Sequence, residues 1–199
     1  MKRLFLEEAQ KNKVFPIGAS LWSRLHPEDR VSTPYTSWRF DGNTVRMTEF
    51  AAPGLGRQSN HVVIDAEFGP KASGVLYALG GASGGLTLYM DAGHLVYEYN
   101  MMVIERYTGH MKDQIPVGKH RIEVTTTVPK PGAPAAVLVA VDGTPVVNVV
   151  VARAVPGAFT ASETLDVGAD LGSPVSLAYF DRRPFVFDGK INSITVDLK

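Results

Sequence analysis

From residue 36 to the C-terminus, the hydrophobic residues fall in short runs rather than in long amphipathic stretches. The runs are rich in β-branched and aromatic residues and are bounded by Gly, Pro, Asp and Asn, which is typical of antiparallel strands. Dipeptides such as Asp142-Gly143 supply the positive φ that a tight hairpin turn needs. The pattern predicts strands near residues 36–40, 45–50, 61–68, 75–79, 86–90, 94–99, 102–107, 119–128, 135–141, 146–154, 165–167 and 189–198.

The alternation within these runs indicates which strand faces meet water. Ile122 and Val124 alternate with Arg121 and Glu123, so one face of that strand is predicted to contact a core and the other face to contact solvent. Residues 135–141 are apolar at every position, and we expect both faces of that strand to be covered. Many strands without intervening helices predict an all-β fold, a two-sheet antiparallel sandwich of jelly-roll type.

A single helix is predicted, and it lies at the N-terminus. Leu4, Phe5 and Ala9 stand at helical spacing with charged residues between them, and Asn12 and Pro16 end the pattern. We therefore divide the chain into two parts. Residues 1–16 form the short helix and its exit segment, and residues 17–199 form one β-sandwich domain.

The amino-acid composition excludes several classes of partner and site. The 20 Lys and Arg residues balance the 20 Asp and Glu residues, so neither nucleic acid nor an anionic membrane is expected as a partner. The absence of cysteine from the 199 residues excludes disulfides, thiolate metal sites and a cysteine nucleophile. No run approaches the roughly 20 apolar residues of a membrane-spanning helix, and residues 1–10 lack the order of a signal peptide. We expect a soluble protein, cytoplasmic, or periplasmic if a leader lies upstream.

Two loop regions invite a search for bound groups. The glycine-dense residues 80–85 lack the Gly-x-Gly-x-x-Gly spacing and lead into a strand, so we expect a tight β connection rather than a nucleotide site. Glu163, Asp166 and Asp170 lie in a glycine-containing stretch whose oxygens suit calcium. The alternative, which the sequence favours, is that these acidic residues cap turns through their own backbone. The sequence requires no cofactor. If a metal ion binds, calcium is the candidate.

A carbohydrate site is predicted from aromatic residues and one arginine. Tyr97 and Tyr99 are two positions apart and share one face of a strand. With Trp38 and Arg106, they offer ring stacking and a planar guanidinium that suits a sulfate group. The alternative, which packing favours, is that both tyrosines fill the space between the sheets.

Several segments resemble known families. Residues 86–99, 116–124 and 139–146 resemble the strand order of laminin-G and concanavalin-like jelly rolls. A closer resemblance, over nearly the whole chain, is to the C-terminal region of large bacterial arylsulfatases of the alkaline-phosphatase-like superfamily. It is carried by GVLYALGG at 74–81, YEYN at 97–100, DVGADLGSPVS at 166–176, FDGKI at 187–191 and the helix with its exit at 4–16.

The resemblance implies a non-catalytic accessory domain. Sulfatases make formylglycine from a Cys/Ser-x-Pro-x-Arg motif, but here Ser32 and Pro34 are followed by Thr36 where the arginine belongs. We therefore predict a chain that is not an enzyme and that contacts a sulfatase catalytic domain or associates with itself. The alternative is a lectin-like carbohydrate-binding module for a sulfated or plain glycan. A third interpretation, a glucanase-like enzyme, needs paired carboxylates, for which Glu98 and Glu105 are the nominal candidates.

Overall fold

The computed structural model describes residues 2–12, 35–160 and 162–199, and the chain divides into two compact units, Met1–Ser32 and Thr33–Lys199. The first unit contains helix α1 (Lys2–Lys11), as predicted. The predicted boundary after residue 16 lies outside the described residues. Within the described residues, no helix combines the length and the apolar character needed to cross a membrane.

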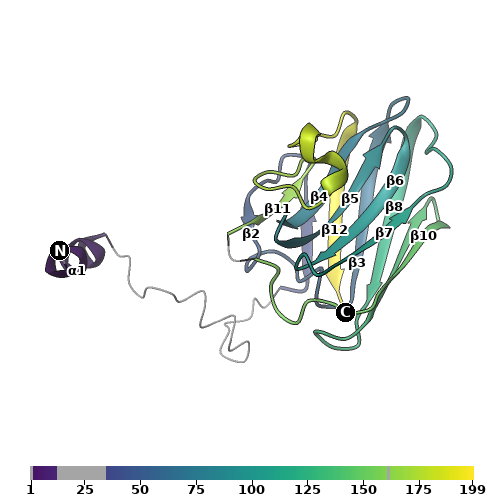
Figure 1. Ribbon diagram of the computed structural model, residues 1–199. Coiled ribbons are helices and arrows are strands. Elements are labelled where there is room, and N and C mark those ends of the chain that lie inside the picture. The colour runs from purple at the N-terminus through teal and green to yellow at the C-terminus, as the bar shows by residue number, and fades with distance from the viewer. Residues whose placement is uncertain (1, 13–34, 161) are drawn as a thin grey trace. The chain divides into compact units, whose positions relative to one another are not determined.

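The second unit is a sandwich of two six-stranded antiparallel sheets (Figure 1). The first sheet contains, in spatial order, β1 (Ser37–Phe40), β12 (Lys190–Leu198), β3 (Asn60–Phe68), β8 (Gly118–Thr127), β9 (Ala135–Val141) and β10 (Thr144–Val151). The second sheet contains β2 (Met47–Thr48), β11 (Thr164–Val167), β4 (Gly74–Gly81), β5 (Gly84–Asp91), β6 (His94–Met101) and β7 (Glu105–His110). The predicted all-β sandwich is therefore confirmed.

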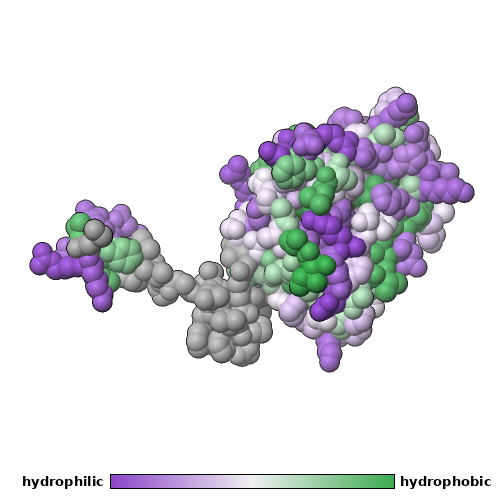
Figure 2. Space-filling view, in the orientation of Figure 1, coloured by the Kyte–Doolittle hydropathy of each residue, from purple (hydrophilic) through white to green (hydrophobic). Residues whose placement is uncertain are grey.

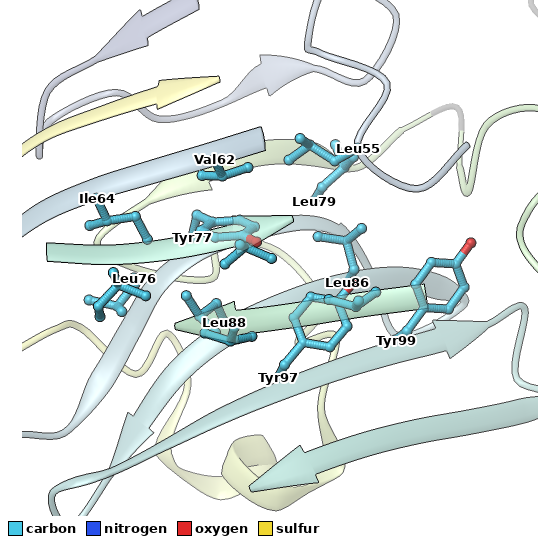
Figure 3. Packing of buried hydrophobic residues seen from close by; sticks show 14 of the residues in the cluster. Leu55, Val62, Ile64, Leu76, Tyr77, Leu79, Leu86, Leu88, Tyr97 and Tyr99 are labelled. Carbon is cyan, nitrogen blue, oxygen red and sulfur yellow. The ribbon is translucent and has the colours of Figure 1, made fainter. Parts of the chain in front are cut away.

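The main core lies between the two sheets. Because side chains alternate between the faces of a strand, every second residue of the central strands points into this space. Val62 and Ile64 of β3 lie on one side, and Leu86 and Leu88 of β5 lie on the other (Figure 3). These side chains are almost completely shielded from water, so apolar burial between the sheets supplies the main stabilising free energy.

The glycine-dense residues 80–85 form the β4–β5 hairpin, as predicted. Gly80 pairs directly with Gly85 across the two strands. A Cβ atom on Gly85 would lie 2.5 Å from the carbonyl oxygen of Leu79, so only glycine fits this close backbone approach.

Several strand predictions were wrong in detail. Of the strand predicted near residues 45–50, only Met47–Thr48 pair, and the strand predicted near 146–154 spans Thr144–Val151. Strand β7 begins at Glu105 rather than at residue 102, because Met102 and Val103 adopt positive φ values of 52° and 64° and form the turn. Strand β9 was expected to be covered on both faces. Its outer face is open, and Leu138 is 42 % exposed.

Residues 170–187, here called the cover segment, lie across the outer face of the second sheet. They include the 3-10 helix η2 (Leu177–Arg182), which the sequence analysis did not predict. Tyr179 and Phe185 of the cover segment pack against Tyr89 of β5, with ring centroids 5.0 and 6.2 Å away. Arg182 adds two hydrogen bonds of 2.8 and 3.0 Å to the Asp91 carboxylate. The cover segment thus builds a second, smaller core (Val75, Ala78, Tyr89, Val96, Val175, Tyr179 and Phe185).

Candidate functional site

The four residues predicted to contact carbohydrate do not form one site. Tyr97 and Tyr99 are 1 % and 2 % exposed and belong to the main core, so the prediction that they contact a ligand was wrong. Their face of β6 is the one that points toward the first sheet. Trp38 packs against the same core from β1, at one edge of the first sheet. Arg106 lies on β7, which adjoins the opposite edge.

Tyr99 has a structural role that explains its polar atom. Its hydroxyl donates a 2.9 Å hydrogen bond to the Gly56 carbonyl and accepts a 2.7 Å hydrogen bond from the Val155 amide. Both partners lie in long connections at one end of the sandwich. The side chain therefore anchors two loops to the core and has no group left for a ligand.

The acidic residues proposed for calcium each hold a loop. Asp166 accepts hydrogen bonds from the Arg46 amide at 2.6 Å and from the Thr164 hydroxyl at 3.0 Å. Glu163 accepts a 2.6 Å bond from the Ser173 hydroxyl. In the described parts of the chain, no three His, Cys, Asp or Glu residues are grouped so as to hold a metal ion. The bonds from Arg46 and Ser173 join separate segments of the chain, and they differ from the local turn capping that the sequence favoured.

Asp170 differs from these residues because it is buried with one oxygen unpaired. Its Oδ2 accepts hydrogen bonds from the Val175 amide at 2.8 Å and from the Tyr179 hydroxyl at 2.5 Å. Its Oδ1 is buried and has no hydrogen-bond partner among the described residues. Burial, with smaller contributions from nearby carboxylates, raises the pKa of the Asp170 carboxyl to about 6.

Glu98 and Glu105, the nominal glucanase pair, lie on opposite faces of the second sheet. Glu98 is paired across the sheet with Thr108 on the outer face, whereas Glu105 is paired with the core residue Met101. Glu105 also forms an ion pair of 3.0 Å with Arg153. The two carboxyl groups share no cleft, so they do not form the acid and nucleophile pair that a glycoside hydrolase needs.

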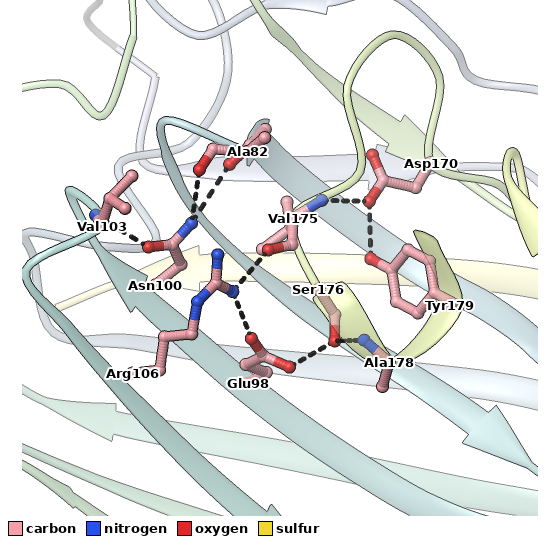
Figure 4. A network of polar contacts seen from close by, with 11 residues as sticks. Ala82, Glu98, Asn100, Val103, Arg106, Asp170, Val175, Ser176, Ala178 and Tyr179 are labelled. Atoms are coloured by element: carbon pink, nitrogen blue, oxygen red, sulfur yellow. Dashed lines mark hydrogen bonds and ion pairs between the residues drawn. The ribbon is translucent and has the colours of Figure 1, made fainter. Parts of the chain in front are cut away.

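The outer face of β7 carries the best candidate site, which is centred on Arg106 (Figure 4). Nη1 of Arg106 donates to Oε1 of Glu98 at 2.6 Å and to the Val175 carbonyl at 2.9 Å. The other Glu98 oxygen accepts a 2.5 Å bond from the Ser176 hydroxyl of the cover segment. Because Glu98 is buried, this network holds the guanidinium in one orientation.

The rest of the Arg106 guanidinium is free to bind another molecule. Both of its hydrogen bonds are made by Nη1, so Nη2 and Nε have no partner among the described residues. Neither atom is among the buried unpaired polar atoms, and the side chain is 25 % exposed. The site therefore presents an oriented guanidinium, ion-paired with the Glu98 carboxylate, whose remaining N–H donors are open to a ligand.

Asn100 lies next to Arg106, its cross-strand partner on β7. The Asn100 side chain is fully buried and donates to the carbonyls of Gly81 at 3.4 Å and Ala82 at 3.0 Å. Its Oδ1 accepts a 3.0 Å bond from the Val103 amide (Figure 4). One side chain thus ties the β4–β5 hairpin to residues 102–104, the tip of the β6–β7 hairpin.

Two segments that hydrogen-bond to residues of the site carry exposed aliphatic side chains. Val103 and Ile104 at the hairpin tip are 63 % and 67 % exposed, and Leu177, next to Ser176 in the cover segment, is 64 % exposed. Figure 2 shows hydrophobic patches beside a hydrophilic band on this face of the sandwich. Val103 is β-branched and holds a positive φ of 64°, a strained conformation that commonly marks functional loops.

Comparisons with known proteins bear on the fold. No protein-family model and no curated protein matches the chain. The carbohydrate-binding module CBM40 of the Ruminococcus gnavus IT-sialidase, solved with α2,3 sialyllactose, is similar with a TM-score of 0.55 and 14% identity, over 80% of this chain and 90% of that chain. Domains LG4-5 of the mouse laminin α1 chain are similar with a TM-score of 0.51 and 13% identity, over 82% of this chain and 42% of that chain.

At these identities, the likeness concerns the fold alone. Together with the two antiparallel sheets, it defines the class of the protein, a β-sandwich of the concanavalin and laminin-G-like jelly-roll type. This class was predicted from the sequence, and it is confirmed.

Proposed function

We propose that the sandwich is a lectin-like module that binds an acidic glycan at the Arg106 site. The observation that carries the proposal is a guanidinium fixed by Glu98 and the Val175 carbonyl, with its remaining donors open to solvent. Arginine keeps its charge and forms paired, charge-assisted hydrogen bonds with carboxylate or sulfate groups. Because the side chain is already oriented, ligand binding costs little additional side-chain entropy.

The aliphatic neighbours of Arg106 suit the remainder of a sugar. Sugar rings present C–H groups, which pack against apolar side chains such as Ile104 and Leu177, both of which are exposed. The similarity to a module solved with α2,3 sialyllactose, an acidic sugar, supports a glycan as the ligand. The proposed site therefore combines charge-assisted hydrogen bonds from Arg106 with apolar contacts from the neighbouring aliphatic side chains.

The test is titration calorimetry of the full chain with α2,3 sialyllactose and with lactose, which lacks the acidic group. We expect the acidic sugar to bind more tightly, and Arg106→Gln to weaken its binding by about tenfold or more. Arg106→Lys keeps the charge but loses the planar fork, so we expect an intermediate loss. Arg39→Gln removes an exposed arginine from the first sheet and serves as the matched control.

Melting curves of each variant separate loss of binding from loss of folding, because Arg106→Gln leaves the buried Glu98 without its cation. Equal affinity of the wild type and a folded Arg106→Gln variant would reject the site. An array of carboxylated and sulfated glycans without any bound member would reject the function.

The proposal includes the statement that the chain is not an enzyme. It is based on the missing formylglycine motif, because Thr36 stands where that motif requires arginine. We expect no hydrolysis of an aryl sulfate by the purified chain. The finer proposal, an accessory domain of an arylsulfatase-like protein, is supported by the sequence resemblance alone. A formylglycine motif upstream in the same reading frame would support it.

A further inference from the structure

The four edges of the two sheets differ in how they are protected. Strand β2 has two residues, and β1 has four, which include the charged Arg39. Strand β7 carries Glu105, Arg106 and His110. Strand β10, in contrast, has eight residues with the sequence TPVVNVVV and no charged side chain. Short strands and charged residues are common means of keeping an edge from pairing with another chain, and β10 uses neither. Two further means, a proline and a β-bulge, occur only at the start of β10, at Pro145.

The surface beside the β10 edge is also unprotected. Leu138 of β9 and Val150 of β10 are 42 % and 67 % exposed on the outer face of the first sheet, and Ala136, the exposed cross-strand partner of Val150, lies beside them. Between residues 135 and 151, the only charged residue is Asp142, which lies in the turn. The edge of β10 and the outer face next to it are therefore uncharged, with exposed apolar side chains on both sides of one exposed polar residue, Asn148.

The backbone of β10 has unused hydrogen-bonding capacity. Its ladder partners all lie on β9, and no other backbone hydrogen bond involves residues 144–151 within the described chain. An edge strand directs every second N–H and C=O group away from its only neighbour. Pro145, which lacks an N–H group, and the bulge between Pro145 and Val147 restrict regular pairing to the residues that follow.

We propose that β10 pairs with β10 of a second copy of this chain, in antiparallel orientation about a two-fold axis through Asn148. The two six-stranded sheets would then join into one continuous sheet. In this register, Val147 faces Val149 of the other copy, and Val146 faces Val150. The strand is therefore complementary to itself, which is what a two-fold interface requires.

A second copy fits this edge better than a charged partner does. The two-fold register brings Asn148 opposite its own copy and valine opposite valine, so no charge is removed from water. The side chains of Leu138 and Val150 continue the apolar contact beside the joined strands. The edge lies on the first sheet, whereas Arg106 lies on the outer face of the second sheet, so this inference does not depend on the proposed glycan site.

The first experiment measures the mass of the full chain in solution by light scattering over a range of concentrations. We expect twice the chain mass of 21.5 kDa. Asn148→Lys places two positive charges opposite each other at the two-fold axis and should give the single-chain mass. Ser37→Lys introduces the same charge at the exposed β1 edge and should leave the dimer intact.

The second experiment uses the absence of cysteine from the chain. Residues directly opposite each other in antiparallel strands have Cα atoms about 4.5–5.5 Å apart, which suits a disulfide. Asn148→Cys should therefore form a covalent dimer under mild oxidation, whereas Ser37→Cys should not. A single-chain mass at every concentration would overturn the proposal. A dimer that persists in Asn148→Lys without crosslinking through Asn148→Cys would overturn it equally.

Discussion

Individual buried carboxylates organise the loops of this molecule. Glu49 accepts hydrogen bonds from the amides of Phe159 and Thr160 at 2.7 and 2.8 Å, and Glu98 bonds Arg106 and Ser176. In both residues, protein donors replace the water that a carboxylate loses on burial. Asp170 is only partly compensated, because its Oδ1 has no hydrogen-bond partner among the described residues. Because of this difference, the ionisation of Asp170 should make the stability of the fold depend on pH.

Replacing Asp170 by asparagine should remove the free-energy cost of burying a charged carboxylate, a cost that grows as the pH rises. The pKa of Asp170 is raised from 3.8 to about 6 in the folded protein, so the native state binds an extra proton between these values. The contribution of this carboxyl group to the free energy of unfolding is therefore fully present below pH 3.8, and it is lost as the pH rises through 6. Relative to the wild type, the free energy of unfolding of Asp170→Asn should rise by about 3 kcal/mol between pH 3 and pH 7.

The measurement is urea unfolding of both proteins across this pH range. Asp113→Asn, at an exposed position, is the control and should show no comparable trend. A constant difference between Asp170→Asn and the wild type at all pH values would contradict the assignment.

Local alternation predicted strand positions well because the pleat imposes a period of two on every half-buried strand. The same alternation correctly placed Tyr97 and Tyr99 on one face of β6. It could not show what covers that face, because the covering strands are distant in the sequence. Helix η2 was missed because its six residues expose Leu177 and Phe180, so they show no buried periodic pattern. The link between Glu98 and Ser176, 78 positions apart, has no local signal at all.

Among the connecting elements, the β4–β5 and β6–β7 hairpins depend on Asn100. Asn100→Ala removes the donor to the Gly81 and Ala82 carbonyls and the acceptor for the Val103 amide. We expect a loss of about 2–3 kcal/mol in the free energy of unfolding, because buried polar groups are left unpaired. Hydrogen exchange at the Val103 amide should accelerate in parallel.

Asn192→Ala, at an exposed position on β12, provides the comparison and should change stability little. Unchanged exchange at Val103 in a folded Asn100→Ala variant would show that the hairpin tip keeps its shape by other contacts.

The sandwich should fold without the N-terminal unit. All members of the main core lie between Phe40 and Val196, and both ends of that range are in paired strands. Domains with their own core generally fold alone. We expect residues 33–199 to show the same cooperative thermal transition as the full chain, by differential scanning calorimetry. A broad transition at a lower temperature would assign residues 1–32 a stabilising role.

The cover segment determines how a polymer can approach the protein. Because Tyr179 and Phe185 already occupy the outer face of the second sheet, a long polysaccharide cannot lie across those strands. Arg106 lies on the edge strand β7, beside the border of the cover segment at Val175. For the proposed glycan binding, this arrangement predicts contact with the terminal unit of a branch, so the number of molecules bound would report how many free ends a glycan has rather than how long it is.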